Sequence, residues 1–162
     1  MLRKKDKYGY SVLHHAVYRN NLNLVTNLLE EKGLEHEATD EQGNTALHLA
    51  AQGQDPAMVA ILMEHISLQV VSRESRVKGV NKEGRTPLHV AASTGCEAAV
   101  EVILGSEDSS TILEHRDSRG MTALLVAAAS GNIETVNMII EKGADIRVRS
   151  KDRETALHIS SR

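Results

Sequence analysis

The chain has 162 residues, of which 41% are hydrophobic and 25% charged, and its net charge at pH 7 is −3. This acidic balance argues against nucleic-acid binding, because a surface that neutralises phosphates is expected to be basic. No apolar run approaches the roughly 18 residues that a membrane-spanning helix needs. We therefore expect neither nucleic acid nor direct membrane contact by this segment.

The chain contains one cysteine, Cys96, which cannot form an internal disulfide. Free thiols are typical of reducing compartments. Met1 is followed by the basic stretch LRKKDKYG with no apolar run behind it, so we expect no secretory signal peptide. These features predict an intracellular, cytoplasmic protein, with the nucleus and the cytosolic face of a membrane protein as alternatives.

One short sequence pattern occurs five times along the chain. A Ser or Thr anchors each copy, at spacings of 34, 41, 36 and 33 residues: Ser11, Thr45, Thr86, Thr122 and Thr155. An Asp or Asn stands five positions before each of the first four anchors, and a Gly stands two positions before. This D-x-x-G pattern indicates a tight turn, because Asp and Asn bond the following backbone and Gly accepts a positive φ. Arg153 replaces the glycine in the fifth copy.

Two helices are predicted after each of the first four anchors. Apolar residues at helical spacing follow the anchor, as in Leu47, Ala50 and Ala51, and the Ser or Thr is a plausible helix N-cap. After a break at Asn or Gly, a second apolar stripe begins 14 residues beyond the anchor in all four copies. Neither helix can bury its apolar face alone, so we expect the copies to stack around one continuous core.

The copies divide the chain into units at approximately 6–39, 40–80, 81–116 and 117–149, followed by a partial unit at 150–162. The second unit carries an insertion at 65–79, which either extends its second helix or forms a protruding loop. The polar run SEDSST at 106–111 is expected to be a solvated loop.

The anchored segments resemble the ankyrin repeat family, whose unit has about 33 residues and the signature T-P-L-H-x-A. TPLHVA at 86–91 matches that signature in full, and TALHLA at 45–50 and TALHIS at 155–160 are close. The resemblance covers nearly the whole chain. It implies a single all-α domain over 1–162, a solenoid of stacked helix–turn–helix units with projecting β-hairpin or turn fingertips. Because the fifth unit stops after its first helix, we interpret the chain as a fragment of a longer array.

The histidine of this signature recurs and could in principle be a metal ligand, a catalytic base or part of the scaffold. The four positions concerned are His14, His48, His89 and His158. Packed helices lie about 8–10 Å apart, whereas zinc needs ligand nitrogens at roughly 2.0–2.1 Å, so equivalent residues cannot converge on one ion. No catalytic motif accompanies them, and Leu125 replaces the histidine in unit four. We expect structural histidines, no cofactor, no metal and no enzymatic activity. In the family, this histidine ties the fingertip to the helix by hydrogen bonds.

All three tyrosines lie in the first unit, where the family resemblance implies a partner-facing groove. Tyr8 and Tyr10 flank the first turn glycine, and Tyr18 ends the first helix. Tyrosine is frequent at binding hot spots. Alternatively, these side chains cover the end of the stack or pack against a preceding repeat. The predicted protein-binding residues are Tyr8, Tyr10, Tyr18, Arg19, Glu41, Gln42, Asn44, Lys82, Glu83, Arg85, Ser118, Arg119 and Met121.

Together these features predict a non-enzymatic scaffold that binds another protein through its concave face and fingertips. It would form part of a larger intracellular signalling or adaptor protein. The alternative is the cytosolic array of a TRPA-type ion channel, which the stretch at 112–132 resembles. Inhibitors of the NF-kappa-B type also carry extended loops between repeats, so this likeness leaves both possibilities open.

Overall fold

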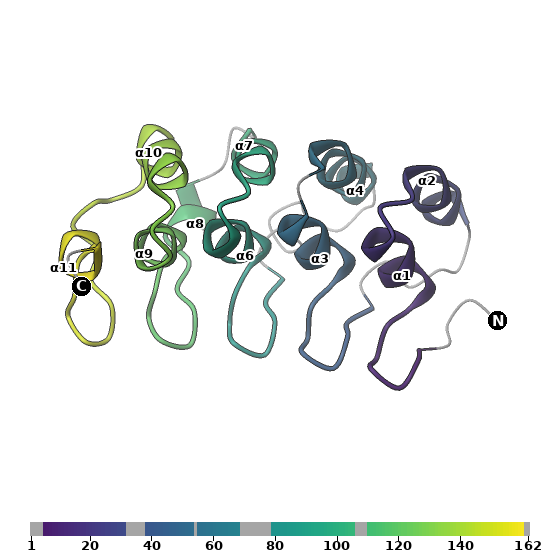
Figure 1. Ribbon diagram of the computed structural model, residues 1–162, viewed down its shortest axis with the longest axis horizontal. Helices are drawn as coiled ribbons and strands as arrows, with labels where there is room; N and C mark the ends of the chain where they lie inside the picture. Colours follow the sequence, from purple (N-terminus) through teal and green to yellow (C-terminus); the bar gives the residue numbers. More distant parts are fainter. Residues whose placement is uncertain (1–4, 32–37, 54, 69–78, 106–109, 161–162) are drawn as a thin grey trace.

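The computed structural model describes residues 5–31, 38–53, 55–68, 79–105 and 110–160, and all regular structure within them is helical (Figure 1). The helices form two rows, an inner row next to projecting turns and an outer row behind it. The inner row consists of α1 (Val12–Tyr18), α3 (Ala46–Gln52), α6 (Pro87–Thr94), α9 (Ala123–Ala129) and α11 (Ala156–Ser160). The outer row consists of α2 (Leu22–Glu30), α4 (Pro56–Leu68), α7 (Glu97–Leu104) and α10 (Ile133–Glu141). The predicted all-α class is therefore confirmed.

The inner helices begin at the anchors because Ser or Thr caps their first turn. Thr86 is the N-cap of α6, and its side chain accepts a hydrogen bond from the backbone N–H of His89. In return, the His89 ring accepts a hydrogen bond from the Thr86 backbone, which completes a capping box. Pro87 occupies the first helical position, where its missing N–H costs nothing. Ser11 and Thr45 form the same box with the histidine three residues on.

Packing of each unit on the next produces one continuous core. Consecutive inner helices contact one another along the stack, and so do consecutive outer helices from α2 to α10. Alanines of the inner helices such as Ala51, Ala92 and Ala127 are fully buried, and their small size allows the helices to approach closely. Larger side chains, among them Leu88 and Ile103, fill the space between the two rows. In a solenoid, each unit depends on its neighbours for this burial.

The fingertips are hydrogen-bonded turns, and the structure assigns no β-strand to the residues that it describes. In the second unit, Asp40 accepts hydrogen bonds through its side chain from the backbone of Gln42 and Asn44. Gly43 has a φ of +79°, and a Cβ there would lie 2.9 Å from the backbone nitrogen of Lys82. Glycine is therefore required both by backbone conformation and by the close approach of the next turn.

Backbone hydrogen bonds also join each fingertip to the next. These hydrogen bonds, with N···O distances of 2.9–3.3 Å, run from Glu41 N–H to Tyr8 O, Lys82 N–H to Gln42 O, Ser118 N–H to Glu83 O and Lys151 N–H to Arg119 O. The tips thus form one row along an edge of the molecule opposite the outer helices (Figure 1).

Two connecting segments differ in length from the rest. Helix α4 has 13 residues, so the second outer helix extends into the insertion, and 69–78 lie outside the described residues. After α7, part of the expected solvated loop forms the short helix α8 (Ser110–Leu113), while 106–109 lie outside the described residues. Burial of Ile112 and Leu113 holds α8 against the core.

Candidate protein-binding surface

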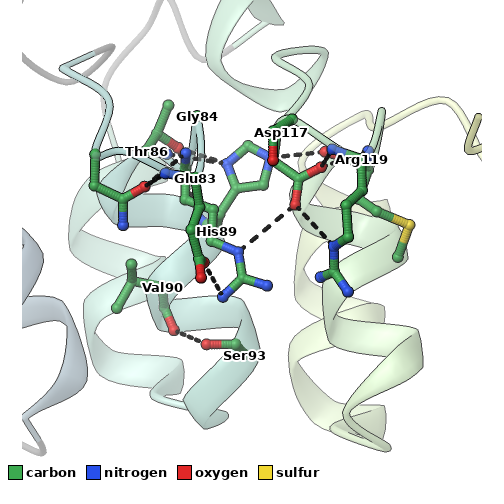
Figure 2. A network of polar contacts seen from close by, with 12 residues as sticks. Glu83, Gly84, Thr86, His89, Val90, Ser93, Asp117 and Arg119 are labelled. Carbon is green, nitrogen blue, oxygen red and sulfur yellow. Dashed lines mark hydrogen bonds and ion pairs between the residues drawn. The ribbon is translucent and has the colours of Figure 1, made fainter. Parts of the chain in front are cut away.

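The recurring histidines bridge consecutive units. In α6, the His89 Nδ1 lies 2.8 Å from Thr86 Oγ1, and its Nε2 lies 3.0 Å from the carbonyl oxygen of Met121 in the next fingertip (Figure 2 shows Thr86 and His89). His14 and His48 repeat this geometry, with Nε2 at 2.9 Å from the carbonyl oxygens of Asn44 and Arg85. A carbonyl only accepts hydrogen bonds, so Nε2 carries a proton. Nδ1 is the acceptor because the backbone N–H of Ser11, Thr45 or Thr86 donates to it. All three rings are therefore neutral.

Burial favours the same neutral state. His89 is fully buried, and burial lowers its pKa to about 4. Burial likewise lowers the pKa of His14 and of His48. Both ring nitrogens of each histidine are occupied by contacts within the chain, so they are not presented to a substrate or ion. Within the described part of the chain, no group of three His, Cys, Asp or Glu side chains is arranged to hold a metal.

The fourth unit lacks this bridge because Leu125 stands in place of histidine. The Thr122 hydroxyl, whose equivalents contact a histidine ring, is buried there with no hydrogen-bond partner. In the fifth unit, Thr155 Oγ1 again lies 2.7 Å from His158 Nδ1, but His158 is exposed. The link between the fourth and fifth units therefore differs in kind from the earlier ones.

The three tyrosines occupy different environments. Tyr8 is 54% exposed on the first fingertip, and its ring lies 4.8 Å from the Lys7 ammonium. Tyr18 is 73% exposed at the end of α1. Tyr10 is half-buried and stacks on His14, with ring centroids 5.7 Å apart. Of the three rings, Tyr8 and Tyr18 offer most of their surface to a partner, whereas Tyr10 also supports the first histidine bridge.

A pocket of about 580 Å³ adjoins Tyr18 between the first and second units. The lining residues include Val17, Tyr18, Leu49, Asp55, Pro56 and Met58. Gly53, the C-cap of α3, is extended (φ −78°, ψ 161°), whereas Gly95 and Gly131, which follow α6 and α9, have positive φ. Beside this pocket, the Asn20 side chain of the first unit donates a hydrogen bond to Asp55 Oδ2 of the second unit at 3.0 Å. The pocket was not predicted from the sequence.

The remaining predicted binding residues divide into exposed and buried groups. Exposed on the surface are Arg19, Glu41, Gln42, Lys82, Glu83, Ser118 and Arg119. Asn44 and Met121 are only 9% and 8% exposed. Both immediately precede an anchor, where the side chain turns into the stack. Their burial removes them from the surface that a partner could reach.

A polar contact links fingertips at the position before the anchor. In unit two, the Asn44 side chain accepts a hydrogen bond from Asn81 at 2.9 Å. In unit three, the Arg85 Nε lies 3.6 Å from the buried Asp117 carboxylate. The Arg119 Nε lies 3.7 Å from the same oxygen, so Asp117 sits between two guanidinium groups (Figure 2 labels Asp117 and Arg119). Arg85 is 22% exposed, and its Nη1 also contacts Glu83 at 3.0 Å. Arg85 therefore has a partner on each side within the chain.

None of the described helices is both long and apolar enough to cross a lipid bilayer. Cys96 is buried at the start of α7, where its thiol donates a hydrogen bond to the Gly53 carbonyl. Its contacts are those of a packed structural residue.

Comparison with known proteins gives relatives of several kinds. The chain is 32% identical over 149 residues to the B-cell lymphoma 3 protein homolog of Mus musculus, covering 92% of this chain and 32% of that protein. It is 33% identical over 148 residues to the transient receptor potential cation channel subfamily A member 1 homolog of Caenorhabditis elegans, covering 91% and 11%. It is 22% identical over 160 residues to the nuclear factor NF-kappa-B p105 subunit of Gallus gallus, covering 96% and 16%. The chain thus spans about a third or less of each relative.

The sequence also matches the profile described as ankyrin repeats (3 copies) over residues 13–112, 65–150 and 109–162. Ankyrin repeats are protein–protein interaction modules and are generally non-enzymatic. The turns, helix pairs and histidine bridges described above agree with that match. The chain belongs to the ankyrin repeat family.

Proposed function

We propose that this chain is a non-enzymatic scaffold that binds a partner protein through the inner helices and the fingertips. In this proposal it works inside the cell, in the cytoplasm, as part of a larger signalling or adaptor protein. The relatives support this role because the B-cell lymphoma 3 protein homolog matches across nearly the whole chain.

The observation that carries the proposal is the exposed ring of Tyr18 beside the pocket between the first two units. A tyrosine 73% exposed next to apolar walls from Leu49 and Met58 gives a partner both contact area and a hydroxyl. Tyr8, which is exposed on the fingertip of the same unit, adds a second aromatic ring to this surface. The stack holds these groups in place before binding, which lowers the entropy cost of association.

Site-specific photo-crosslinking tests this surface. A photoreactive phenylalanine at position 18 should crosslink one partner in cells, whereas the same group at the exposed Asn137 of the outer helix α10 should not. Adding Tyr8→Ala should reduce the yield at position 18, while the thermal melt of the purified protein stays unchanged. Equal capture from both positions would contradict the proposal.

The second candidate is the cytosolic array of an ion channel. The observation in its favour is the 33% identity to the Caenorhabditis elegans channel homolog. Fractionation of cells that express the full-length protein separates the two candidates. A channel sediments with membranes and resists extraction by salt, whereas a soluble adaptor stays in the supernatant.

In either candidate we propose that further repeats continue the array after α11. A groove of about 790 Å³ lies over α10 and α11, with Ile133, Ile140 and Leu157 exposed in it by 66%, 40% and 78%. At every earlier unit, an outer helix of the next unit covers the equivalent face. A longer form of the protein should therefore protect Leu157 in side-chain footprinting, and unchanged labelling would argue against continuation.

A further inference from the structure

Charge is separated between the two edges of this molecule. The four outer helices contain the carboxylates Glu30, Glu64, Glu97, Glu101, Glu134 and Glu141, and no Lys or Arg lies within their bounds. The inner helices contain no Asp, Glu, Lys or Arg at all. In the described part of the chain, the Lys and Arg side chains therefore lie in the turns and connections. The fingertips and the acidic outer helices occupy opposite edges (Figure 1).

The basic residues concentrate on the fingertips of the third, fourth and fifth units. The exposed cations there are Lys82, Arg116, Arg119, Arg149, Lys151 and Arg153, against the exposed carboxylates Glu83 and Asp152. Asp117 is only 1% exposed, and its one negative charge is shared between Arg85 and Arg119. On the first fingertip, by contrast, Lys7 stands next to Asp6, and the second carries Glu41.

Two of these cations contact backbone carbonyl groups of the fourth and fifth fingertips, and a third lies near a buried carboxylate. Arg116 Nη1 donates hydrogen bonds to the carbonyl oxygens of Gly120 at 2.8 Å and Arg149 at 2.6 Å. Lys151 Nζ donates to the Ser118 carbonyl at 2.5 Å. Arg119 lies with its Nε 3.7 Å from Asp117, and its side chain is 63% exposed. Each side chain uses one nitrogen in its contact within the chain. It retains further N–H donors, since a guanidinium has five N–H groups and an ammonium has three.

We propose that Arg116, Arg119 and Lys151, here called the basic fingertip surface, bind an acidic segment of a partner protein. The proposal rests on the protein-binding function proposed above and names the chemistry of the partner. Guanidinium groups match carboxylates in a bidentate geometry, and side chains already fixed lose less entropy on binding. The acidic outer helices repel the same segment, which favours its approach from the fingertip edge.

A protein segment fits this surface better than nucleic acid does. Glu83 and Asp152 interrupt the row of cations, whereas a phosphate backbone requires neutralisation along its whole length. A short acidic segment can place its carboxylates on the cations and avoid the two exposed acids.

The test uses a fluorescein-labelled peptide of 12 alternating Glu and Ser residues, with a Gln-for-Glu peptide as its control. Fluorescence anisotropy should show saturable binding of the Glu peptide to the purified chain at low salt, weakening as salt rises. The double variant Arg119→Glu, Lys151→Glu should lose roughly tenfold or more in affinity, since each reversal removes an attraction and adds a repulsion. The matched variant Lys7→Glu, Lys142→Glu makes the same charge change elsewhere and should stay within about twofold.

Several outcomes would overturn the proposal. These are equal binding of the Glu and Gln peptides, an equal loss in the matched control, or tighter binding of single-stranded DNA or phosphatidylserine vesicles than of the Glu peptide. Arg119→Gln, Lys151→Gln guards against misfolding, because it should give a smaller loss with an unchanged melt. Failure of the peptide test leaves the crosslinking result at position 18 intact, so the two proposals can be told apart.

Discussion

At the scale of single residues, the histidine of the repeat signature is best described as a two-ended linker. In His89, one nitrogen accepts from the cap of its own helix, and the other donates to the next fingertip. Both bonds require a neutral ring with its proton on Nε2. Protonation of Nδ1 would set a donor against the backbone N–H of Thr86. The linker therefore works only above the pKa of the buried ring.

This leads to a prediction about pH. Because burial lowers the pKa of His89 to about 4, the unfolded chain takes up a proton first as pH falls below about 6.5. The contribution of the neutral His89 ring to the free energy of unfolding should be complete above pH 6.5. It should fall between 6.5 and 4, with a slope of at most about 1.4 kcal/mol per pH unit for each such ring. Urea titrations from pH 7.5 to 4 measure this slope. His89→Leu should lower stability at pH 7.5 and reduce the slope, and an unchanged slope would refute the assignment.

The threonine N-caps of α6 and α9 give a second prediction. Thr86→Val removes the hydroxyl contact to His89 and should cost about 1–2 kcal/mol. Thr122→Val removes a buried hydroxyl that has no partner, so it should be neutral or stabilising. The substitutions are isosteric, and each serves as the control for the other in chemical denaturation. Equal losses would show that the hydroxyl–imidazole contact contributes nothing.

Register and family resemblance predict structural histidines, and His14, His48 and His89 each contact the next fingertip. They do not predict the burial of two fingertip residues. Asn44 and Met121 stand at positions assigned to the surface, yet both turn into the stack. Register places a residue on a turn without giving its side-chain direction. That direction depends on the adjacent fingertip, which lies more than thirty residues away in sequence, as the Asn81 contact to Asn44 illustrates.

At the scale of elements, each fingertip depends on a left-handed residue two positions before its anchor. Gly84 has a φ of +71°, and a Cβ there would lie 2.9 Å from the Ser118 nitrogen. Arg153 adopts a φ of 61° at the equivalent position in the fifth unit. A non-glycine residue pays a conformational cost for this backbone. The fifth fingertip is therefore built with strain that the first four avoid.

Arg153→Gly should stabilise the fifth fingertip by up to about 1 kcal/mol, whereas Gly84→Ala should destabilise the stack by about 1–3 kcal/mol. Hydrogen exchange reports both effects locally. The Arg153 amide, which bonds the Ser150 carbonyl, should exchange more slowly in the glycine variant. Faster exchange there would mean that the arginine side chain contributes more than its backbone costs.

Most helices could be predicted because their apolar spacing repeats in register. Helix α8 could not, since STIL is too short for periodicity to show and polar residues precede it. Burial of Ile112 and Leu113 against the core stabilises it, and this tertiary effect is invisible in the local sequence. The pocket beside Tyr18 was missed for a similar reason, because it depends on the gap between two units.

At the scale of the whole molecule, stability is shared through contacts between neighbouring units. Ile103 lies in α7, which packs against both α4 and α10, and it is fully buried. Ile140 lies on the last outer helix and is 40% exposed. A solenoid of this kind behaves approximately as a sum of unit and interface contributions.

Ile103→Ala should therefore lower the free energy of unfolding by about 2–5 kcal/mol. Ile140→Ala removes the same atoms from a half-covered site and should cost less than half as much. Denaturant titration of both variants measures the difference. Similar losses would indicate that the face of α10 is covered in solution, for example by a second copy, which a concentration series would detect.

The backbone bonds between fingertips also have an evolutionary consequence. They use main-chain N–H and C=O groups, for example Ser118 N–H to Glu83 O, and so hold for any side chain at these positions other than proline at the donor. Mutation can therefore change the chemical character of the tips, residue by residue, without disturbing the register of the stack. A lineage could exchange one binding preference for another while the molecule stays folded throughout.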